Sequence, residues 1–292
     1  MKIPTKKLKN GFEMPVYGLG TWRMGGGLSR DVNNNDEEDI TVIKTAIEVG
    51  ITYIDTAEVY AGGFSEILLG KAIAGYDRSK LFLGSKVDTQ KHAKYNDVII
   101  ACKNSLKRLN TSYIDLYMTH RYNPPDVSYK ETMKAMDALV DEGLVRHIGF
   151  CNYRVSDIQD AQNNAEHRLV AAQMHYNLQI REVERKEILD YCQKNNIMLI
   201  AWRPIQKGAL VNNPPKIVKD LMKKYGKTAS QIAINWLISQ ENVVTLSKTA
   251  SIDHLRENLG GVGWKMEKED IEKLRIEYPN QREVSDSVPL NF

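Results

Sequence analysis

Several features that would classify the chain at once are missing from its sequence. Only three cysteines occur, Cys102, Cys151 and Cys192, and their wide spacing fits neither a disulfide framework nor a CxxC metal site. The six histidines do not form an HExxH pattern. We therefore expect a cytoplasmic protein without a bound metal.

An excess of charge of one sign and long hydrophobic runs are also lacking. The 40 basic and 37 acidic residues leave a formal net charge of +3 over 292 residues, which is weak support for a nucleic-acid partner. No apolar run reaches the ~18 residues of a spanning helix. The opening MKIPTKKLKNGFEMP has no apolar stretch of the kind that secretory signals carry. We expect neither nucleic acid nor membrane as a partner.

What is present is a globular composition, 42% hydrophobic and 26% charged, with a repeated alternation of strands and helices. Short apolar runs such as ITYIDTA (51–57) and LFLGSKV (81–87) alternate with amphipathic segments about eight times. This alternation predicts an α/β protein with parallel strands covered by helices, and eight units predict a (β/α)8 TIM barrel. An open dinucleotide-binding sheet is disfavoured, because GLGTWRMGG does not supply the GxGxxG spacing.

We predict a single domain over residues 1–292, beginning with a β-hairpin that closes the bottom of the barrel. In KLKNGFEM, Asn10-Gly11 stands between two short strands and is a pair typical of two-residue hairpin turns. One continuous helix is predicted from Glu182 to Asn195.

Polar residues end the apolar runs, at the place where a barrel keeps its active site. Asp55, Lys86 and His120 follow one another at intervals of 31 and 34 residues, about one strand–helix unit each. We therefore expect them at one height around the mouth of the barrel. Other runs end at Cys151-Asn152, Gln173, Trp202-Arg203 and near Lys248.

Proton donation is the chemistry that this group supports. A tyrosine has an ordinary pKa near ~10, and a neighbouring ammonium lowers it. Lys86 would act in this way on Tyr60, Asp55 would keep Lys86 charged, and His120 would hydrogen-bond a carbonyl oxygen. Taken singly, Lys86 and Asp55 also fit a structural ion pair and His120 a core histidine. Burying all of them at one mouth is costly unless they satisfy one another.

The order of the motifs resembles the aldo-keto reductase family. The matching stretches cover nearly the whole chain: GLGTW (18–22), IDTAEVY (54–60), GSKV (84–87), SLKRLNTSYIDLYMTH (105–120), IGFCNY (148–153), QMHYNL (173–178), AWRPIQKGAL (201–210) and SKTASIDHLREN (247–258). The resemblance implies a (β/α)8 barrel with an N-terminal hairpin and an NADP(H)-dependent carbonyl reductase. It also implies a catalytic tetrad of Asp55, Tyr60, Lys86 and His120, with Tyr60 as the general acid.

The resemblance also implies which residues hold the cofactor and the substrate. Nicotinamide would be held through its carboxamide by Asn152 and Gln173 and stacked on Trp202. The implied cofactor residues are Thr21, Trp22, Asp55, Asn152, Gln173, Trp202, Arg203, Lys248, Thr249, His254, Glu257 and Asn258. The implied substrate residues are Trp22, Tyr60, His120 and Tyr122.

Three positions depart from the family pattern. Cys151 replaces a usual serine and is expected to be a small buried residue. Arg203 replaces another serine and places a cation where it could reach the cofactor pyrophosphate. His254 replaces the arginine that reads the 2′-phosphate, and histidine is mostly neutral at pH 7. Because Lys248 is retained, we predict a weakened preference for NADP(H), with NAD(H) as the alternative cofactor.

The substrate is predicted from the segments that would surround the mouth. The loop GGGLSRDVNNNDEE (25–38) and the tail YPNQREVSDSVPLNF (278–292) are polar, which favours small or polar aldehydes and ketones. Two alternatives stay open. One is a nicotinamide-nucleotide-binding regulatory subunit of the same fold that acts through a protein partner. The other is a Schiff-base aldolase that uses Lys86. Monomer and dimer are both open.

Overall fold

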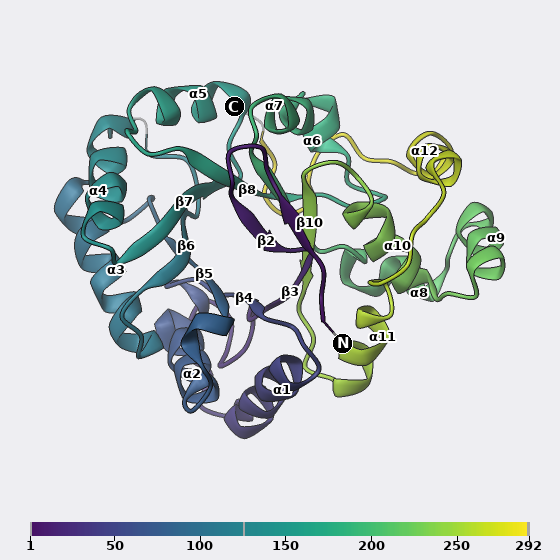
Figure 1. Cartoon of the computed structure of the whole chain (residues 1–292), viewed down its shortest axis with the longest axis horizontal. Helices are drawn as coiled ribbons and strands as arrows, with labels where there is room; N and C mark the ends of the chain where they lie inside the picture. Colours follow the sequence, from purple (N-terminus) through teal and green to yellow (C-terminus); the bar gives the residue numbers. More distant parts are fainter. Residues whose placement is uncertain (1, 125, 291–292) are drawn as a thin grey trace.

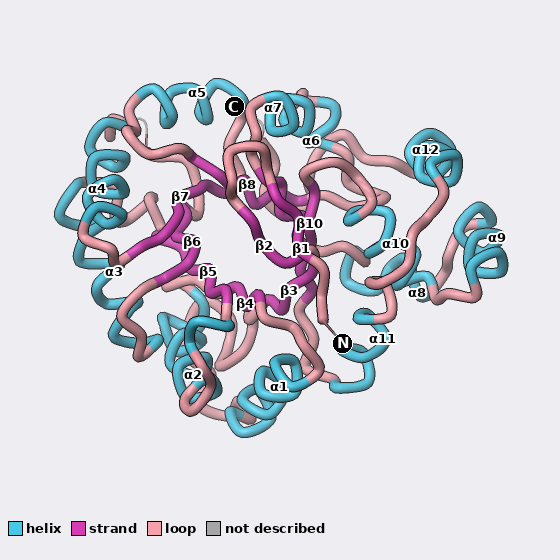
Figure 2. Tube along the Cα trace, viewed as in Figure 1, coloured by secondary structure: helices cyan, strands magenta, loops and turns pink. Residues whose placement is uncertain are grey.

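A closed barrel of eight parallel strands forms the centre of the protein, as the computed structural model shows for residues 2–124 and 126–290. The strands pair in the order β10-β3-β4-β5-β6-β7-β8-β9, and β10 returns to β3 to close the ring, which helices surround (Figure 1, Figure 2). The predicted (β/α)8 barrel is confirmed. Its strands are β3 (Tyr17–Gly20), β4 (Tyr53–Asp55), β5 (Phe82–Val87), β6 (Ile114–Thr119), β7 (Val145–Cys151), β8 (Leu169–His175), β9 (Met198–Trp202) and β10 (Val243–Ser247).

The predicted N-terminal hairpin is present, although its turn is wider than the two residues expected. Strands β1 (Thr5–Lys7) and β2 (Glu13–Pro15) pair antiparallel, with Lys7 opposite Glu13, so residues 8–12 form the connection. The ring of Phe12 packs 6.2 Å from that of Phe82, at the start of β5. The hairpin therefore covers the amino-terminal end of the barrel, across its opening in Figure 1.

The outer helices begin and end at residues suited to those positions. Asn35 caps α1 by accepting from the backbone N–H of Glu38, and Thr228 with Gln231 forms a capping box on α10. Asn110 in left-handed conformation ends α3, and Gly226 ends α9. The helices are α1 (Asp36–Glu48), α2 (Phe64–Ile73), α3 (Tyr95–Leu109), α4 (Tyr129–Asp141), α5 (Val155–Asn163), α6 (Glu182–Arg185), α7 (Ile188–Lys194), α8 (Ala209–Asn212), α9 (Lys216–Tyr225), α10 (Ala229–Ile238), α11 (Ile252–Leu259) and α12 (Lys268–Glu277), with short 3-10 turns η1 (Tyr60–Gly63), η2 (Arg78–Lys80) and η3 (Gln206–Gly208).

The continuous helix predicted for residues 182–195 is wrong. The segment divides into α6 and α7, because Glu187 adopts the left-handed conformation with φ of 58° and interrupts the helical hydrogen bonds. Glu182, at the start of α6, is buried and bonded to the C-terminal segment, so tertiary contacts fix the position of this short helix.

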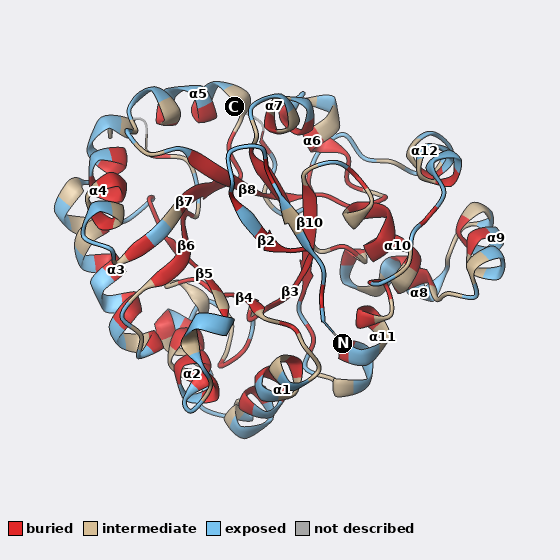
Figure 3. Ribbon diagram, in the orientation of Figure 1, coloured by how far each residue is buried: buried red, intermediate tan, exposed pale blue. Residues whose placement is uncertain are grey.

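Burial follows the layers of the fold. The barrel strands are buried along nearly their whole length, whereas the outward faces of the surrounding helices are exposed (Figure 3). This explains why the strands read as apolar runs without alternation. Across residues 2–124 and 126–290, no helix combines the length and the apolar character needed to cross a membrane.

Candidate active site

The residues predicted to form a tetrad lie together at the carboxyl ends of three adjacent strands. Asp55 ends β4, Lys86 is the penultimate residue of β5, and His120 follows β6 directly. Because β4, β5 and β6 are neighbours in the barrel, their ends bring these side chains to one side of the mouth. Tyr60 reaches the same place from η1, the first turn after β4.

Asp55 and Lys86 form a buried ion pair. Lys86 Nζ lies 2.6 Å from Asp55 Oδ2 and donates a second hydrogen bond of 2.6 Å to the backbone oxygen of Thr56. The second carboxylate oxygen, Oδ1, accepts from Gln173 Nε2 at 2.7 Å and from the Tyr53 hydroxyl at 3.2 Å. Burial alone would lower the pKa of Lys86, but the Asp55 carboxylate raises it overall, so the ammonium stays charged.

Tyr60 lies in an aromatic setting beside this ion pair. Its ring centre is 5.2 Å from Lys86 Nζ, 5.0 Å from the ring of Trp22 and 5.7 Å from that of His120. Burial raises the pKa of Tyr60 to about 12, although the charge of Lys86 works to lower it. Lys86 thus acts on the pKa of Tyr60 in the predicted direction, but burial outweighs it, and the phenol is protonated at neutral pH.

His120 is held as a neutral imidazole. Its backbone N–H donates to the Val87 oxygen at 2.8 Å, which ties the end of β6 to β5. Burial, together with the charges of Lys86 and Arg121, holds the pKa of His120 well below its usual range. A neutral ring has one N–H, so it can donate one hydrogen bond without adding a positive charge to the site.

Cys151, Asn152 and Gln173 occupy the ends of β7 and β8, next to the ion pair. Gln173 lies opposite Cys151 in the sheet and is bonded to Asp55, as given above. The Cys151 thiol lies 3.9 Å from the side-chain oxygen of Gln173, and burial raises its pKa. Asn152 adopts a left-handed conformation with φ of 58°, and its side-chain amide donates to the His120 backbone oxygen at 3.4 Å. The predicted carboxamide ligands therefore adjoin the predicted tetrad.

Trp202 ends β9 and lies flat against His175, the last residue of β8. Their ring centres are 4.0 Å apart with an angle of 11° between the planes. Arg203 has φ of 57°, and its guanidinium lies 5.0 Å from the Trp202 ring and 3.7 Å from Asp286 in the C-terminal segment. Its Nη1 is buried and has no hydrogen-bond partner among the described residues.

The residues predicted for the adenosine end lie after β10 and on α11. Thr249 stabilises the turn that enters α11, since its hydroxyl accepts from the backbone N–H of Ser251 at 3.0 Å. Asn258 is buried and donates to Ser247 Oγ at 3.2 Å, so its side chain is hydrogen-bonded within the protein. Glu257 is partly buried, whereas the side chains of Lys248 and His254 are exposed.

A surface hollow of about 680 Å³ lies between the first turn of α1 and the start of α11. His254 lines one side of it, and Glu37 and Glu38 line the other. Partial desolvation and the charge of Arg23 lower the pKa of Lys248, while the charges of Asp39 and Glu38 act in the opposite direction. Acidic side chains therefore lie in the predicted 2′-phosphate region together with the cations Lys248 and Arg23.

The predicted substrate residues border the mouth. Trp22 follows β3 and packs on Tyr60, whereas Thr21 is buried beneath it and accepts from the hydroxyl of Ser65 at 2.9 Å. Tyr122 is partly buried against the core. A second hollow, of about 700 Å³, has His120 in its lining and is bordered mainly by polar and charged side chains, among them Glu58, Asp88, Lys91, His92, Asp97, Arg108 and Arg121.

Sequence reasoning missed two residues that the structure places in this site, Tyr53 and His175. Tyr53 stands two positions before Asp55, and His175 two positions after Gln173. In a strand, such pairs project to the same side of the sheet, so the period of two could have found both. The contacts of His175 with residues 285 and 286 have no comparable local signal.

The chain belongs to the aldo/keto reductase family, which it matches over residues 17–276. It is 33% identical to methylglyoxal reductase YeaE of Escherichia coli (strain K12) over 270 residues, covering 91% of this chain and 92% of that protein. It is 31% identical to glyoxal reductase of Bacillus subtilis (strain 168), covering 92% and 91%. The chain is thus an NAD(P)H-dependent oxidoreductase, as the motifs predicted.

Solved structures agree with this assignment. A thermostable aldo-keto reductase in complex with the inhibitor epalrestat superposes with a TM-score of 0.88 at 38% identity, covering 93% of this chain and 98% of that one. An aldo-keto reductase of Klebsiella pneumoniae in complex with NADPH gives a TM-score of 0.84 at 31% identity, covering 97% and 98%.

Proposed function

We propose that the protein reduces the carbonyl group of small or polar aldehydes and ketones to an alcohol, with NADP(H) preferred and Tyr60 as the general acid. The observation that carries this proposal is the convergence of Tyr60, Lys86, Asp55 and His120 at the barrel mouth. An NADPH-bound neighbour and relatives named methylglyoxal reductase and glyoxal reductase support it.

The side chains at the mouth fit a nicotinamide cofactor. Trp202 is only partly buried beside His175, and we take the nicotinamide to stack on its ring. The amides of Asn152 and Gln173 offer both donors and acceptors to a carboxamide, and Arg203 Nη1 is a buried donor without a hydrogen-bond partner among the described residues. NADPH supplies the hydride that carbonyl reduction requires.

Residues of the chain itself would donate the proton and stabilise the negative charge that remains. Tyr60 holds a phenolic proton at neutral pH, because burial raises its pKa to about 12. As negative charge develops on the carbonyl oxygen, Tyr60 donates this proton, and the nearby Lys86 ammonium stabilises the phenolate that remains. Asp55 orients Lys86, and the neutral His120 donates a hydrogen bond to the same oxygen.

The proposed substrate class rests on the two polar segments expected around the mouth, residues 25–38 and 278–292. The first segment is rich in glycine, asparagine and acidic residues, and the second carries few aromatic side chains. Such a surface satisfies hydroxyl and second carbonyl groups better than a hydrocarbon skeleton. Small dicarbonyls and hydroxylated aldehydes are therefore favoured over steroid-like ketones.

Tyr60→Phe tests the function together with an assay of the unmodified protein. Oxidation of NADPH and of NADH is followed against methylglyoxal, glyoxal, a simple sugar aldehyde and a bulky ketone. We expect turnover of small carbonyls with NADPH, and a loss of about 100-fold or more in kcat for Tyr60→Phe with little change in NADPH affinity. Near-normal kcat in the variant would remove Tyr60 from the mechanism. Nucleotide binding without oxidation by any carbonyl would favour the partner-binding alternative, and borohydride trapping of substrate on Lys86 would favour an aldolase.

A further inference from the structure

His175 is held by several neighbours, although no catalytic role is predicted for it. It ends β8, is 3% exposed, and lies parallel to the indole of Trp202. Both ring nitrogens are engaged: Nδ1 is 2.7 Å from Ser285 Oγ, and Nε2 is 3.0 Å from Gln206 Oε1. A residue that merely filled space beside Trp202 would not need two polar partners.

The surrounding hydrogen bonds determine the tautomer of His175. Gln206 Nε2 donates to Asp286 Oδ2 at 2.8 Å, so its Oε1 is an acceptor. This contact, at 3.0 Å, is shorter than the 3.4 Å approach of Asn177 Nδ2 to His175 Nε2, so we assign the proton to Nε2. Ser285 Oγ already accepts from the backbone N–H groups of residues 287 and 288, at 3.2 and 3.0 Å, so its hydroxyl donates to His175 Nδ1. His175 is thus a neutral ring that joins the C-terminal segment to the loop after β9.

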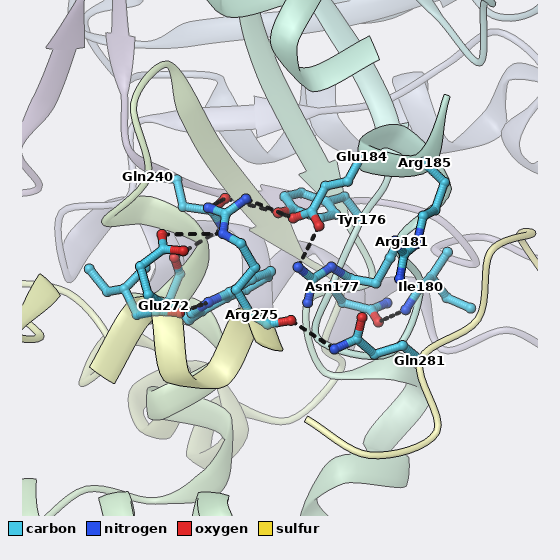
Figure 4. Close-up of polar contacts among 12 residues, drawn as sticks. Tyr176, Asn177, Ile180, Arg181, Glu184, Arg185, Gln240, Glu272, Arg275 and Gln281 are labelled. Carbon is cyan, nitrogen blue, oxygen red and sulfur yellow. Dashed lines mark hydrogen bonds and ion pairs between the residues drawn. The ribbon is translucent and has the colours of Figure 1, made fainter. Parts of the chain in front are cut away.

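The C-terminal segment, residues 279–290, is anchored independently of this contact. Arg282 bridges to the loop after β8, with its N–H donating to the Gln179 oxygen at 2.7 Å. Arg275 of α12 accepts from Gln281 through its backbone oxygen at 2.8 Å and donates to Glu184 at 3.1 Å (Figure 4). These contacts fix the position of the segment independently of His175. The hydrogen bond from Ser285 therefore ties the histidine ring to a segment that is already held.

Asp286 adds a second connection to the same indole. Its carboxylate accepts from Gln206 and lies 3.7 Å from Arg203 Nη1, whose guanidinium adjoins the Trp202 ring. Ser285 is thus connected to Trp202 through His175, and the next residue, Asp286, is connected to it through Arg203. Shifting the segment would move both supports of the indole together.

We propose that His175 is a positioning residue through which the C-terminal segment holds Trp202 in place, so that docking of residues 285 and 286 sets how tightly the nicotinamide half of the cofactor is bound. The second clause rests on the proposed function, since it takes Trp202 as the nicotinamide platform. The first clause, that the C-terminal segment positions Trp202, concerns the protein alone and is tested without any ligand.

Two variants distinguish the hydrogen bonds of His175 from its stacking on Trp202. His175→Phe keeps a flat ring against Trp202 and removes both hydrogen bonds, and Ser285→Ala removes the hydroxyl donor from a residue that does not touch Trp202. Glu283→Ala is the matched control, because Glu283 is an exposed residue of the same segment. The four tryptophan indole N–H signals are recorded by 15N NMR in the full chain, with the Trp202 signal assigned from Trp202→Phe.

We expect both test variants to shift the Trp202 signal while those of Trp236 and Trp264 stay in place, and Glu283→Ala to shift none. An unmoved Trp202 signal in folded Ser285→Ala would overturn the proposal. A simultaneous shift of all signals would also count against it, because it would report general unfolding rather than a specific connection. His175→Phe then shows whether hydrogen bonds, rather than ring stacking, fix the indole.

Cofactor binding supplies the second readout. Dissociation constants are measured by calorimetry for NADPH and for adenosine 2′,5′-bisphosphate, which lacks the nicotinamide half. We expect NADPH to weaken by about 3- to 10-fold in both test variants, with the fragment unchanged within about 2-fold. Equal weakening of both ligands, or none, would contradict the second clause. If the unmodified protein bound no nucleotide, the proposed function would fail, while the NMR result would still decide the positioning role.

Discussion

His254 lies at the position that the family resemblance assigns to the 2′-phosphate of NADP(H). It faces Glu37 and Glu38 across a hollow, and a histidine there offers a 2′-phosphate neither the permanent charge nor the bidentate donors of an arginine. We expect His254→Arg to strengthen NADPH binding by about 3- to 10-fold, because an exposed charge–phosphate contact contributes roughly 1 kcal/mol. NADH, which has no such phosphate, is the built-in control. An equal change in the two dissociation constants would show that His254 does not face the 2′-phosphate.

His175 also predicts how stability varies with pH. Burial lowers its pKa to about 4, with Arg203 and Lys207 acting in the same direction and Gln206 and Asp286 in the opposite one. The unfolded chain therefore binds this proton before the folded protein does. Stability falls as pH drops from about 6.5 to about 4, by on the order of 3 kcal/mol from this group.

The comparison of urea unfolding at pH 7 and pH 4.5 measures this contribution. His175→Phe removes the titrating ring, so its unfolding free energy should fall less between the two pH values than that of the unmodified protein. Carboxylates titrate in both proteins and cancel in the difference. Identical losses in the two proteins would show that His175 does not titrate differently on folding.

Local pattern predicted the elements well where they depend on local interactions. The strands around Asp55, Lys86 and Trp202 fall within a few residues of their expected positions, since an apolar run bounded by turn residues is a local signal. The interruption at Glu187 and the wide hairpin turn were missed. Both depend on contacts distant in sequence: Glu182 with the C-terminal segment, and Phe12 with the starts of β5 and β7.

A close approach between β3 and β4 links strand packing to the site. Gly18 is opposite Tyr53 in the register, and a Cβ on Gly18 would lie 2.3 Å from a ring carbon of Tyr53. Tyr53 in turn donates to Asp55. We expect Gly18→Ala to displace this ring, to lower the unfolding free energy by about 1–3 kcal/mol, and to lower kcat through Asp55.

Gly27→Ala is the matched control for Gly18→Ala. A Cβ on Gly27 meets nothing within 4 Å, so the added methyl group should change stability by less than about 0.5 kcal/mol. Denaturant unfolding measures both variants. If Gly18→Ala proved as stable and active as Gly27→Ala, the Tyr53 ring would not be confined by β3.

At the scale of the whole molecule, the sequence predicted that the strand ends form one ring. It did not predict which side chains from distant parts of the chain hydrogen-bond there. A repeat of strand and helix determines that Asp55, Lys86 and His120 share one mouth. Nothing local pairs Gln173 with Asp55, 118 residues away, or Ser285 with His175, 110 residues away. These bonds arise only when the barrel closes and the chain end returns to its mouth.

Glu182 holds the returning segment at two points. It is 2% exposed, and its two carboxylate oxygens accept from the backbone N–H groups of Ser285 and Leu290 at 3.0 and 2.9 Å. Glu182→Gln keeps the size but replaces one acceptor by an amide donor, which then faces a backbone N–H. We expect amide hydrogen exchange of residues 285–290 to accelerate by about 10-fold or more.

The effect should stay confined to the end of the chain. The barrel strands keep their own ladders, so exchange in β4, β5 and β6 should be unchanged. Glu187→Gln, an exposed change five residues further on, should leave the whole pattern as it is in the unmodified protein. Acceleration throughout the barrel in Glu182→Gln would mean that the C-terminal segment supports the fold itself. No acceleration at 285–290 would mean that other hydrogen bonds suffice to hold the segment: that of Ser285 with His175, and those of Arg282 with the Gln179 oxygen and with the Arg181 backbone N–H, the last at 2.9 Å.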